Sequence, residues 1–264
     1  MRVNEINLID SDRFKSEAVT EFLKKDDTPH FRGSDVLIFI PVRNEEMSIT
    51  TVVDGVRRVT DFDILIIDDQ STDSTPQIIK NLNIEVLTRC NNSGSRIING
   101  LEIGYALGYK YVIKIDGDNQ HNPDDIIRLY QHALKTNADI VIGSRHLEYF
   151  KASIFSVSGV GMWFCARLTS FIYGKRLTDP TSGFKIWSRR ACEIAIQSFQ
   201  KGKLKQGSTY HVEELLIAAR KKLKVEEISV VMRLRENGKT KSFNKKNLIM
   251  FPLNLIRSIV RAFI

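Results

Sequence analysis

The sequence has few cysteines, and the three that it has are scattered. Cys90, Cys165 and Cys192 form no Cys-x-x-Cys pair. This spacing argues against a zinc site and against a disulfide framework, so we expect a reducing, cytoplasmic environment. Residues 1–9 mix charged and polar side chains and lack the apolar segment of a secretory signal peptide, so none is expected.

Two glycine-rich phosphate-binding motifs are also missing. After the first apolar run the sequence has neither Gly-x-x-x-x-Gly-Lys-Ser nor Gly-x-Gly-x-x-Gly. A nucleotide would therefore have to bind without a cradle of glycine amides, and a metal ion would have to balance the charge of its phosphates. The same absence argues against a nucleotidyltransferase. No nucleic-acid recognition motif is present, so we expect no nucleic-acid partner.

Positive charge is concentrated at the C-terminal end. The formal net charge is +8, and residues 233–264 hold eight Lys and Arg side chains against one acid, Glu236. Within this segment residues 248–264 are mostly apolar but include two arginines, which fits an interfacial amphipathic helix better than a membrane span. We expect a peripheral position on the inner face of the cell membrane. Docking on the chain's own domain or on a partner in a homo-oligomer is the alternative.

Apolar runs alternate with helix-length segments through the first 145 residues. The predicted strands are 36–40, 62–67, 84–87, 111–115 and 138–142, followed after a weaker region by 184–187 and 225–232. Continuously apolar strands separated by helices predict a mostly parallel sheet with helices on both faces. We expect one α/β domain over 34–242. An appended helix would precede it within 1–33, and a basic amphipathic helix would follow within 243–264.

An acidic pair, Asp116 and Asp118, follows the apolar run 111–115. Open parallel sheets bind ligands beyond the carboxyl ends of their strands, so both carboxylates leave the sheet where a ligand would bind. They point the same way if the extended path continues, and Gly117 between them allows close approach of the backbone. Two carboxylates without a His or Cys cluster suit Mg²⁺ or Mn²⁺, which accept substrate phosphates as further ligands. The alternative is an acidic turn that caps the next helix.

Other polar loops are expected at the same edge of the sheet. They are residues 41–46, 68–72 and 143–145. Carboxylates near residues 45 and 69 can accept hydrogen bonds from a ribose or a base. Together with the acidic pair, these loops describe a site for a metal-bound nucleoside diphosphate.

Five short motifs occur in the order found in a known family. They are Pro41–Glu45, Asp68–Thr75, Asp116–Pro123, Asp179–Lys185 and Arg235–Lys241. The first three resemble the signatures of family-2 glycosyltransferases with the GT-A fold, a Rossmann-like sheet flanked by helices. The last two are similar to the dolichol-phosphate mannose synthase branch, which includes bacterial polyprenyl-phosphate sugar transferases. The resemblance covers about residues 34–242. It implies a metal-dependent, inverting hexosyltransferase of cell-envelope glycan biosynthesis that moves a sugar from a nucleoside-diphosphate sugar to dolichol or undecaprenyl phosphate.

The resemblance also implies a role for each matched residue. The nucleoside pocket would be lined by Pro41, Arg43, Glu45, Ile67 and Asp69. Mg²⁺ or Mn²⁺ would be held on the diphosphate by Asp116 and Asp118, with Gly117 between them and Gln120 assisting. The donor diphosphate or the acceptor phosphate would be contacted by Arg145, Arg235 and Lys241, and the reacting sugar would lie beside Asp179. Arg145 and Asp179 are thus catalytic candidates. The alternatives are a turn cap for Asp179, a core position for Ile67 and a solvated basic loop for the last two cations.

The chain departs from that branch in two places. Only Lys151 lies where the branch often has an arginine pair, and the short basic tail stands where transmembrane helices often follow. Residues 211–214 are similar to the acidic acceptor-side motif of other family-2 enzymes, which makes Glu213 a further catalytic candidate. Transfer to a hydroxyl of a cell-surface glycan or teichoic-type acceptor therefore stays open, as does a membrane-associated scaffold. The donor stays open between GDP-linked mannose and UDP-linked glucose or N-acetylhexosamine.

Overall fold

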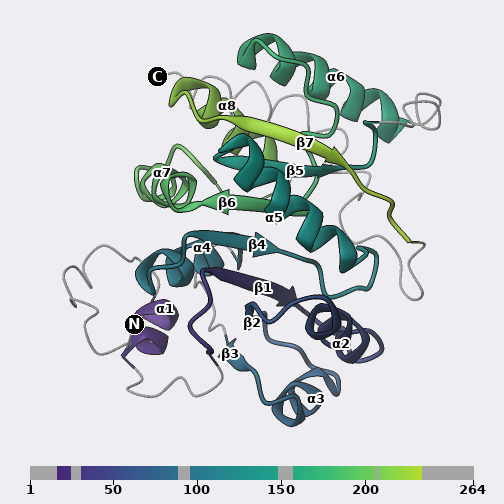
Figure 1. Ribbon diagram of the computed structural model, residues 1–264, viewed down its shortest axis with the longest axis vertical. Helices are drawn as coiled ribbons and strands as arrows, with labels where there is room; N and C mark the ends of the chain where they lie inside the picture. The colour runs from purple at the N-terminus through teal and green to yellow at the C-terminus, as the bar shows by residue number, and fades with distance from the viewer. Residues whose placement is uncertain are drawn as a thin grey trace.

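One sheet runs through the part of the chain that the structure describes (Figure 1). The computed structural model describes residues 17–24, 31–88, 96–147, 157–205, 207 and 209–233. Its strands are β1 (Val36–Val42), β2 (Asp63–Asp68), β3 (Glu85–Thr88), β4 (Tyr111–Lys114), β5 (Ile140–Ser144), β6 (Lys185–Ser188) and β7 (Val225–Ser229). Its helices are α1 (Glu17–Leu23), α2 (Ile49–Val59), α3 (Thr75–Asn81), α4 (Arg96–Ala106), α5 (Asp124–Thr136), α6 (Val157–Tyr173), α7 (Arg189–Gln200) and α8 (Tyr210–Arg220).

The strand order is β3-β2-β1-β4-β6-β5-β7. β1 lies parallel to β2 and β4, β2 lies parallel to β3, and β5 lies parallel to β7. β6 is antiparallel to both of its neighbours, β4 and β5. The prediction of a mostly parallel sheet flanked by helices is therefore confirmed. The order of the strands reverses at β1, between β2 and β4, and such a reversal opens a crevice at the carboxyl ends of the strands.

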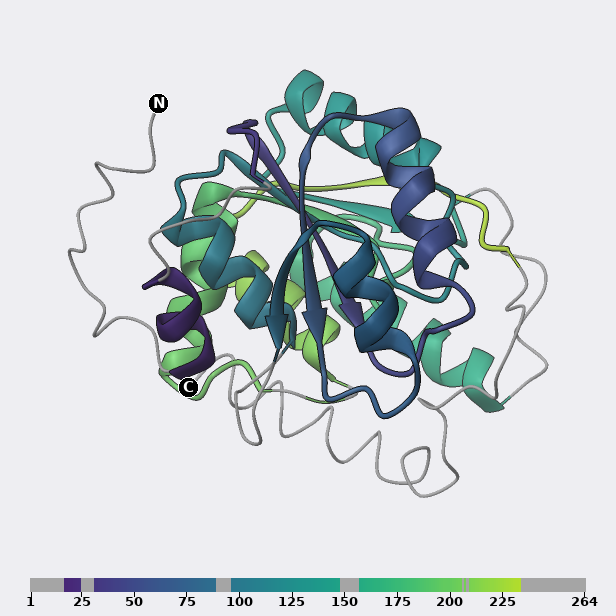
Figure 2. The ribbon, with the colours of Figure 1, turned by 90° about the horizontal axis from the view of Figure 1, so that it is seen from below.

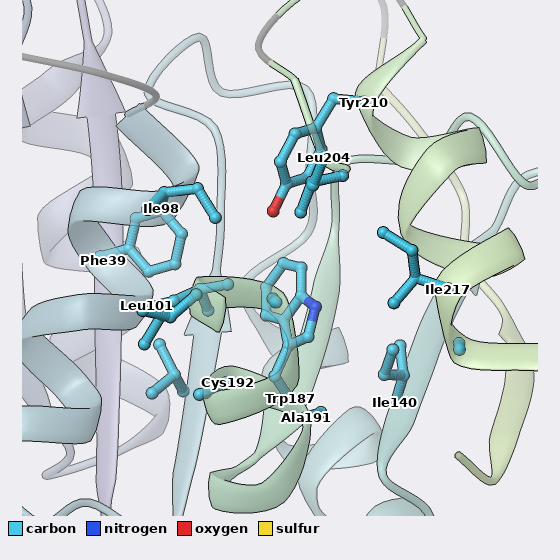
Figure 3. Close-up of a cluster of buried hydrophobic side chains, with 14 of the residues drawn as sticks. Phe39, Ile98, Leu101, Ile140, Trp187, Ala191, Cys192, Leu204, Tyr210 and Ile217 are labelled. Atoms are coloured by element: carbon cyan, nitrogen blue, oxygen red, sulfur yellow. The ribbon is translucent and has the colours of Figure 1, made fainter. Parts of the chain in front are cut away.

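Both faces of the sheet are buried under helices. Alternate side chains of a strand point to opposite faces, so each central strand contributes to two cores. In β1, Leu37 and Phe39 belong to one apolar core, whereas Val36 and Ile38 belong to the other. The first core lies under α1, α4, α7 and α8, and the second lies under α2, α3 and α5 (Figure 2). Figure 3 shows the centre of the first core, where the Phe39 ring lies 6.3 Å from that of Trp187.

The predicted terminal helices are only partly within the described ranges. α1 packs Ala18, Val19 and Phe22 into the first core, while residues 1–16 and 25–30 of the segment in which an appended helix was expected lie outside the described residues. The predicted C-terminal helix, 243–264, lies entirely outside them. Among the described helices, none is long and apolar enough to cross a membrane.

Candidate active site

Hydrogen bonds join the loops that follow β1 and β2. The amide of Asn44 donates to Oγ of Ser71 at 3.0 Å, and the amide of Glu45 donates to Oγ1 of Thr75 at 2.9 Å. In return, Oδ1 of Asn44 accepts from the amide of Thr72 at 2.8 Å. These bonds hold the two loops side by side at the carboxyl edge of the sheet, as the order of the strands requires.

The loop after β4 joins the same group. Oγ of Ser48, at the start of α2, donates to the carbonyl oxygen of Gly117 at 2.7 Å. A Cβ atom on Gly117 would lie only 2.8 Å from Cγ1 of Val42, so the missing side chain is what lets this loop approach β1. The first three predicted motifs therefore lie together at the carboxyl ends of β1, β2 and β4.

The predicted nucleoside-pocket residues divide into two groups. Arg43 is exposed, while Pro41, Glu45 and Asp69 are half-buried at the edge. A carboxylate oxygen of Asp69 lies 3.6 Å from the guanidinium of Arg96 in α4. The remaining residue, Ile67, is fully buried in the first core, in agreement with the alternative of a purely structural position.

β4 ends at Lys114, before the acidic pair. The extended path that would point Asp116 and Asp118 the same way therefore does not continue through both residues. The chain instead turns, with Asn119 at a left-handed φ of 58°, and Oδ1 of Asp118 accepts from the amide of Gln120 at 3.2 Å. Both carboxylates are half-buried.

Asp116 binds two basic side chains that the sequence analysis did not assign. Its Oδ1 pairs with Nζ of Lys114, and its Oδ2 lies 3.2 Å from Nε2 of His121. Burial by itself would raise the pKa of the Asp116 carboxyl, but the charge of Lys114 and the hydrogen bond from His121 outweigh burial and hold that pKa well below its usual value. The carboxylate is thus ionised at neutral pH, and 37% of its side chain is exposed to solvent.

This donor set fits a hard divalent cation. Within the described ranges there is no cluster of three or more His, Cys, Asp or Glu side chains that would enclose a metal. A Mg²⁺ or Mn²⁺ site that binds phosphates needs fewer protein ligands, since one or two carboxylates suffice when substrate oxygens and water supply the remaining ligands. The half-exposed Asp116 and Asp118 meet that requirement. Gln120 lies next to them and donates from Nε2 to the carbonyl oxygen of Arg233 at 3.4 Å.

Arg145 and Asp179 form a two-pronged ion pair beyond the end of β5. Nε of Arg145 donates to Oδ2 of Asp179 at 2.6 Å, and Nη2 donates to Oδ1 at 2.7 Å. The Arg145 amide adds a third bond to Oδ2 at 3.1 Å. Burial alone would raise the pKa of the Asp179 carboxyl, yet the hydrogen bonds and charge of Arg145 hold it below its usual value. Asp179 is therefore a weak base.

Glu213 is the other acid that the sequence suggested as a base. It is 1% exposed, and its carboxylate accepts from the amide of Lys205 at 2.8 Å and from Oγ1 of Thr209 at 3.0 Å. These bonds tie the preceding loop to the first turn of α8. A catalytic role for Glu213 stays a prediction, and the contacts around it are those of a loop anchor.

The neighbouring residues of α8 reach the sheet instead. Glu214 accepts from Nζ of Lys185 at 2.8 Å and from Nε1 of Trp187 at 2.7 Å. His211 Nδ1 lies 3.4 Å from the same Lys185 ammonium, which can only donate, so the proton of the neutral imidazole is on Nε2. Burial, followed by the charges of Lys185 and Lys114, lowers the pKa of His211 well below its usual value and keeps the ring neutral.

Gly183 marks the point where this network meets the acidic pair. A Cβ atom at residue 183 would lie 2.8 Å from Nζ of Lys114, 3.5 Å from Nε2 of His211 and 3.7 Å from Oδ2 of Asp116. The three polar groups therefore converge on the bare face of this glycine. A lysine inside the otherwise apolar run 111–115 was the one sequence signal that could have revealed the cluster.

Three predicted cations cannot be placed. Arg235 and Lys241, expected at the phosphates, and Lys151, in the loop before α6, lie outside the described residues. Arg233 is the last described residue, and its amide donates to the carbonyl oxygen of Gln120 at 2.8 Å. The chain that leads to the last predicted motif therefore leaves from beside the acidic pair.

Comparison with known proteins identifies the family of the chain. The family described as Glycosyl transferase family 2 matches residues 37–193. The chain is 28% identical over 218 residues to the UDP-N-acetylglucosamine--dolichyl-phosphate N-acetylglucosaminyltransferase of Methanococcus voltae, covering 74% of this chain and 84% of that protein. It is 29% identical over 219 residues to the undecaprenyl-phosphate mannosyltransferase of Micrococcus luteus, covering 78% and 86%.

The fold also matches a solved structure. Glucosyl-3-phosphoglycerate synthase from Mycobacterium tuberculosis, in complex with Mn²⁺, UDP and glucosyl-3-phosphoglycerate, superimposes with a TM-score of 0.62. The match covers 88% of this chain and 81% of that one at 18% sequence identity. At this identity the likeness concerns the fold alone.

Proposed function

The chain belongs to glycosyl transferase family 2, and we propose that it is a metal-dependent, inverting enzyme that moves a sugar from a nucleoside-diphosphate sugar to a polyprenyl phosphate. Two relatives support this acceptor, since their names specify transfer to dolichyl phosphate and to undecaprenyl phosphate. Both matches extend over more than 80% of the relative's length.

The observation that carries the proposal is the state of the two candidate bases. A hydroxyl acceptor must lose its proton to a base as it attacks. Asp179 is held ionised by Arg145, and Glu213 is buried under hydrogen bonds to its own loop. A phosphate monoester is already anionic at neutral pH and needs no such base. The site is therefore suited to a phosphate oxygen as the nucleophile.

On the donor side, Asp116 and Asp118 would hold the metal ion, with Gln120 beside them. When bound, Mg²⁺ or Mn²⁺ supplies Lewis-acid stabilisation of the charge on the departing nucleoside diphosphate. Glu45 and Asp69 would accept hydrogen bonds from the nucleoside, and the exposed Arg43 would cover it.

Arg145 would provide a fixed positive charge for the phosphates. Asp179 holds the guanidinium in place by two hydrogen bonds, and the Arg145 side chain remains 30% exposed. Preorganised charge of this kind needs no rearrangement during the reaction. The attacking phosphate oxygen would form a bond to the anomeric carbon as the bond from that carbon to the diphosphate breaks, with inversion. A lipid acceptor would bring the enzyme to a membrane surface, and we propose that this is the inner face of the cell membrane.

The test is a partition assay. The full chain is incubated with Mn²⁺, undecaprenyl phosphate in detergent, and radiolabelled UDP-N-acetylglucosamine or GDP-mannose. We expect label to enter the organic phase with one of these donors, and not with Asp118→Ala protein. Absence of a lipid product with either donor and with UDP-glucose would contradict the proposal. Label transferred instead to a water-soluble glycan acceptor, added in a parallel reaction, would favour the hydroxyl-acceptor alternative.

A further inference from the structure

Two lysines face each other inside the sheet. Lys114 of β4 and Lys185 of β6 are direct partners in the antiparallel register. Their side chains are 7% and 0% exposed. Like charges directly opposite each other destabilise a sheet, and a buried ammonium needs an anionic partner. Each lysine must therefore be neutralised by a carboxylate within reach.

The available carboxylates leave one partner for each lysine. Glu214 is fully engaged, since one of its oxygens accepts from Lys185 and the other from Trp187. Lys114 pairs with Oδ1 of Asp116, the first residue of the acidic pair. Its charge is therefore balanced by a carboxylate that the proposed function assigns to the metal ion.

The position of the Lys114 ammonium is confined. A Cβ atom at Gly183 would lie 2.8 Å from Nζ, so the ammonium lies against the bare backbone of that glycine. His211 borders the same space, and it offers no negative charge. The other oxygen of Asp116 is engaged by Nε2 of His121 at 3.2 Å. An incoming cation would thus meet a carboxylate whose two oxygens both have partners.

We propose that Lys114 is an internal cation that competes with the divalent metal ion for Asp116. This inference rests on the proposed function, because that function assigns the metal to Asp116 and Asp118. A metal ion bound through one or two carboxylates at about 2.0–2.2 Å would share Asp116 with an ammonium a few ångströms away. Repulsion between the two cations lowers the affinity of the free enzyme for the metal. The ion then binds well only when an anionic ligand, such as a nucleoside diphosphate, arrives with it.

The experiment measures Mn²⁺ affinity without nucleotide, by titration followed through the electron paramagnetic resonance signal of free Mn²⁺. Lys114→Met removes the charge and keeps the length of the side chain, and Lys114→Gln does the same with a polar end. We expect both variants to bind Mn²⁺ more tightly than the wild type, by on the order of tenfold or more. Lys114→Arg keeps the charge and should bind as weakly as the wild type.

Two further variants serve as controls. Lys110→Met breaks a surface ion pair with Asp35, 2.8 Å in length, and should leave Mn²⁺ affinity unchanged, which separates a local effect from a change in net charge. Asp118→Ala should lose the tight site in the Lys114→Met background. Thermal unfolding in EDTA establishes that each variant is folded.

The outcomes distinguish the inference from the proposed function. If Lys114→Met and Lys114→Gln bind Mn²⁺ no more tightly than the wild type while Asp118→Ala still abolishes binding, the metal site stands and the competition is refuted. If no variant binds Mn²⁺, or if Asp118→Ala binds it as the wild type does, the assignment of the metal to the acidic pair fails and the inference fails with it.

Discussion

Replacing Asp179 by Asn should destabilise the protein strongly. The carboxylate is 1% exposed and accepts three hydrogen bonds from Arg145, one from the backbone and two from the guanidinium. Asn has the same shape as Asp but carries no charge. Its side-chain NH₂ group can only donate, and it would face the N–H donors of Arg145. Removing one partner of a buried ion pair costs about 3–5 kcal/mol. Because the Arg145 side chain is 30% exposed and can be partly hydrated, we expect the lower part of that range, about 3 kcal/mol.

Chemical denaturation at pH 7 measures this loss directly. For a chain of this size, about 3 kcal/mol corresponds to a melting temperature lower by roughly 6–12 °C. Asp61→Asn is the matched control, since it breaks an exposed pair with Arg32 whose side chains are 95% and 67% accessible. Exposed pairs contribute little, so this variant should unfold with the wild type.

The pH dependence adds an independent check. The folded-state pKa of Asp179 is lower than that of the unfolded chain, so its contribution to stability is complete above the unfolded value of 3.8 and is lost as the pH falls through the folded value. The difference between the wild type and Asp179→Asn should therefore be constant from pH 7 to about pH 5 and shrink below pH 4. A difference under about 1 kcal/mol at pH 7, or one that is unchanged at pH 3, would refute the description of this pair.

Three other predictions follow from the core. Burial raises the pKa of Glu102 to about 7, so the free energy of unfolding should fall as the pH rises from 4.5 to 7. Glu102→Gln should remove this pH dependence and raise the free energy of unfolding at pH 8 by up to about 3 kcal/mol, as measured by urea denaturation. Gly104→Ala would place a Cβ atom 2.4 Å from Cγ2 of Val112, and calorimetry should show a loss of about 1–3 kcal/mol. Trp187→Phe leaves one Glu214 oxygen without its indole donor and should lower the free energy of unfolding by about 1–3 kcal/mol. Unchanged stability in any of these variants contradicts the corresponding contact.

Local pattern was enough to predict most of the sheet. The apolar runs at 36–40, 62–67, 84–87 and 138–142 each became a strand within about two residues of the predicted ends, because continuous burial of a strand is visible in its own residues. The antiparallel insertion of β6 between β4 and β5 could not be predicted, since strand pairing depends on contacts between distant segments.

The site was predictable in its location and less so in its contacts. The loop motifs indicated the carboxyl edge at β1 and β4, where the structure brings them together. The partners of the acids were hidden, because they come from elsewhere in the chain. Arg145 reaches Asp179 across 34 positions, and Lys185 reaches Glu214 across 29. Lys114 and His121 were the exceptions, since they lie two and five residues from Asp116.

The central claim is that the sugar acceptor is a lipid phosphate and not a lipid alcohol. The most direct measurement compares undecaprenyl phosphate with undecaprenol under identical conditions, using mass spectrometry to detect the glycosylated lipid. Because hydrogen bonds engage both candidate bases, Asp179 and Glu213, while Arg145 offers a cation to an anionic nucleophile, we predict a product from the phosphate and none from the alcohol. Equal or faster transfer to undecaprenol would contradict the account, since a hydroxyl can react only where a base is ready to take its proton.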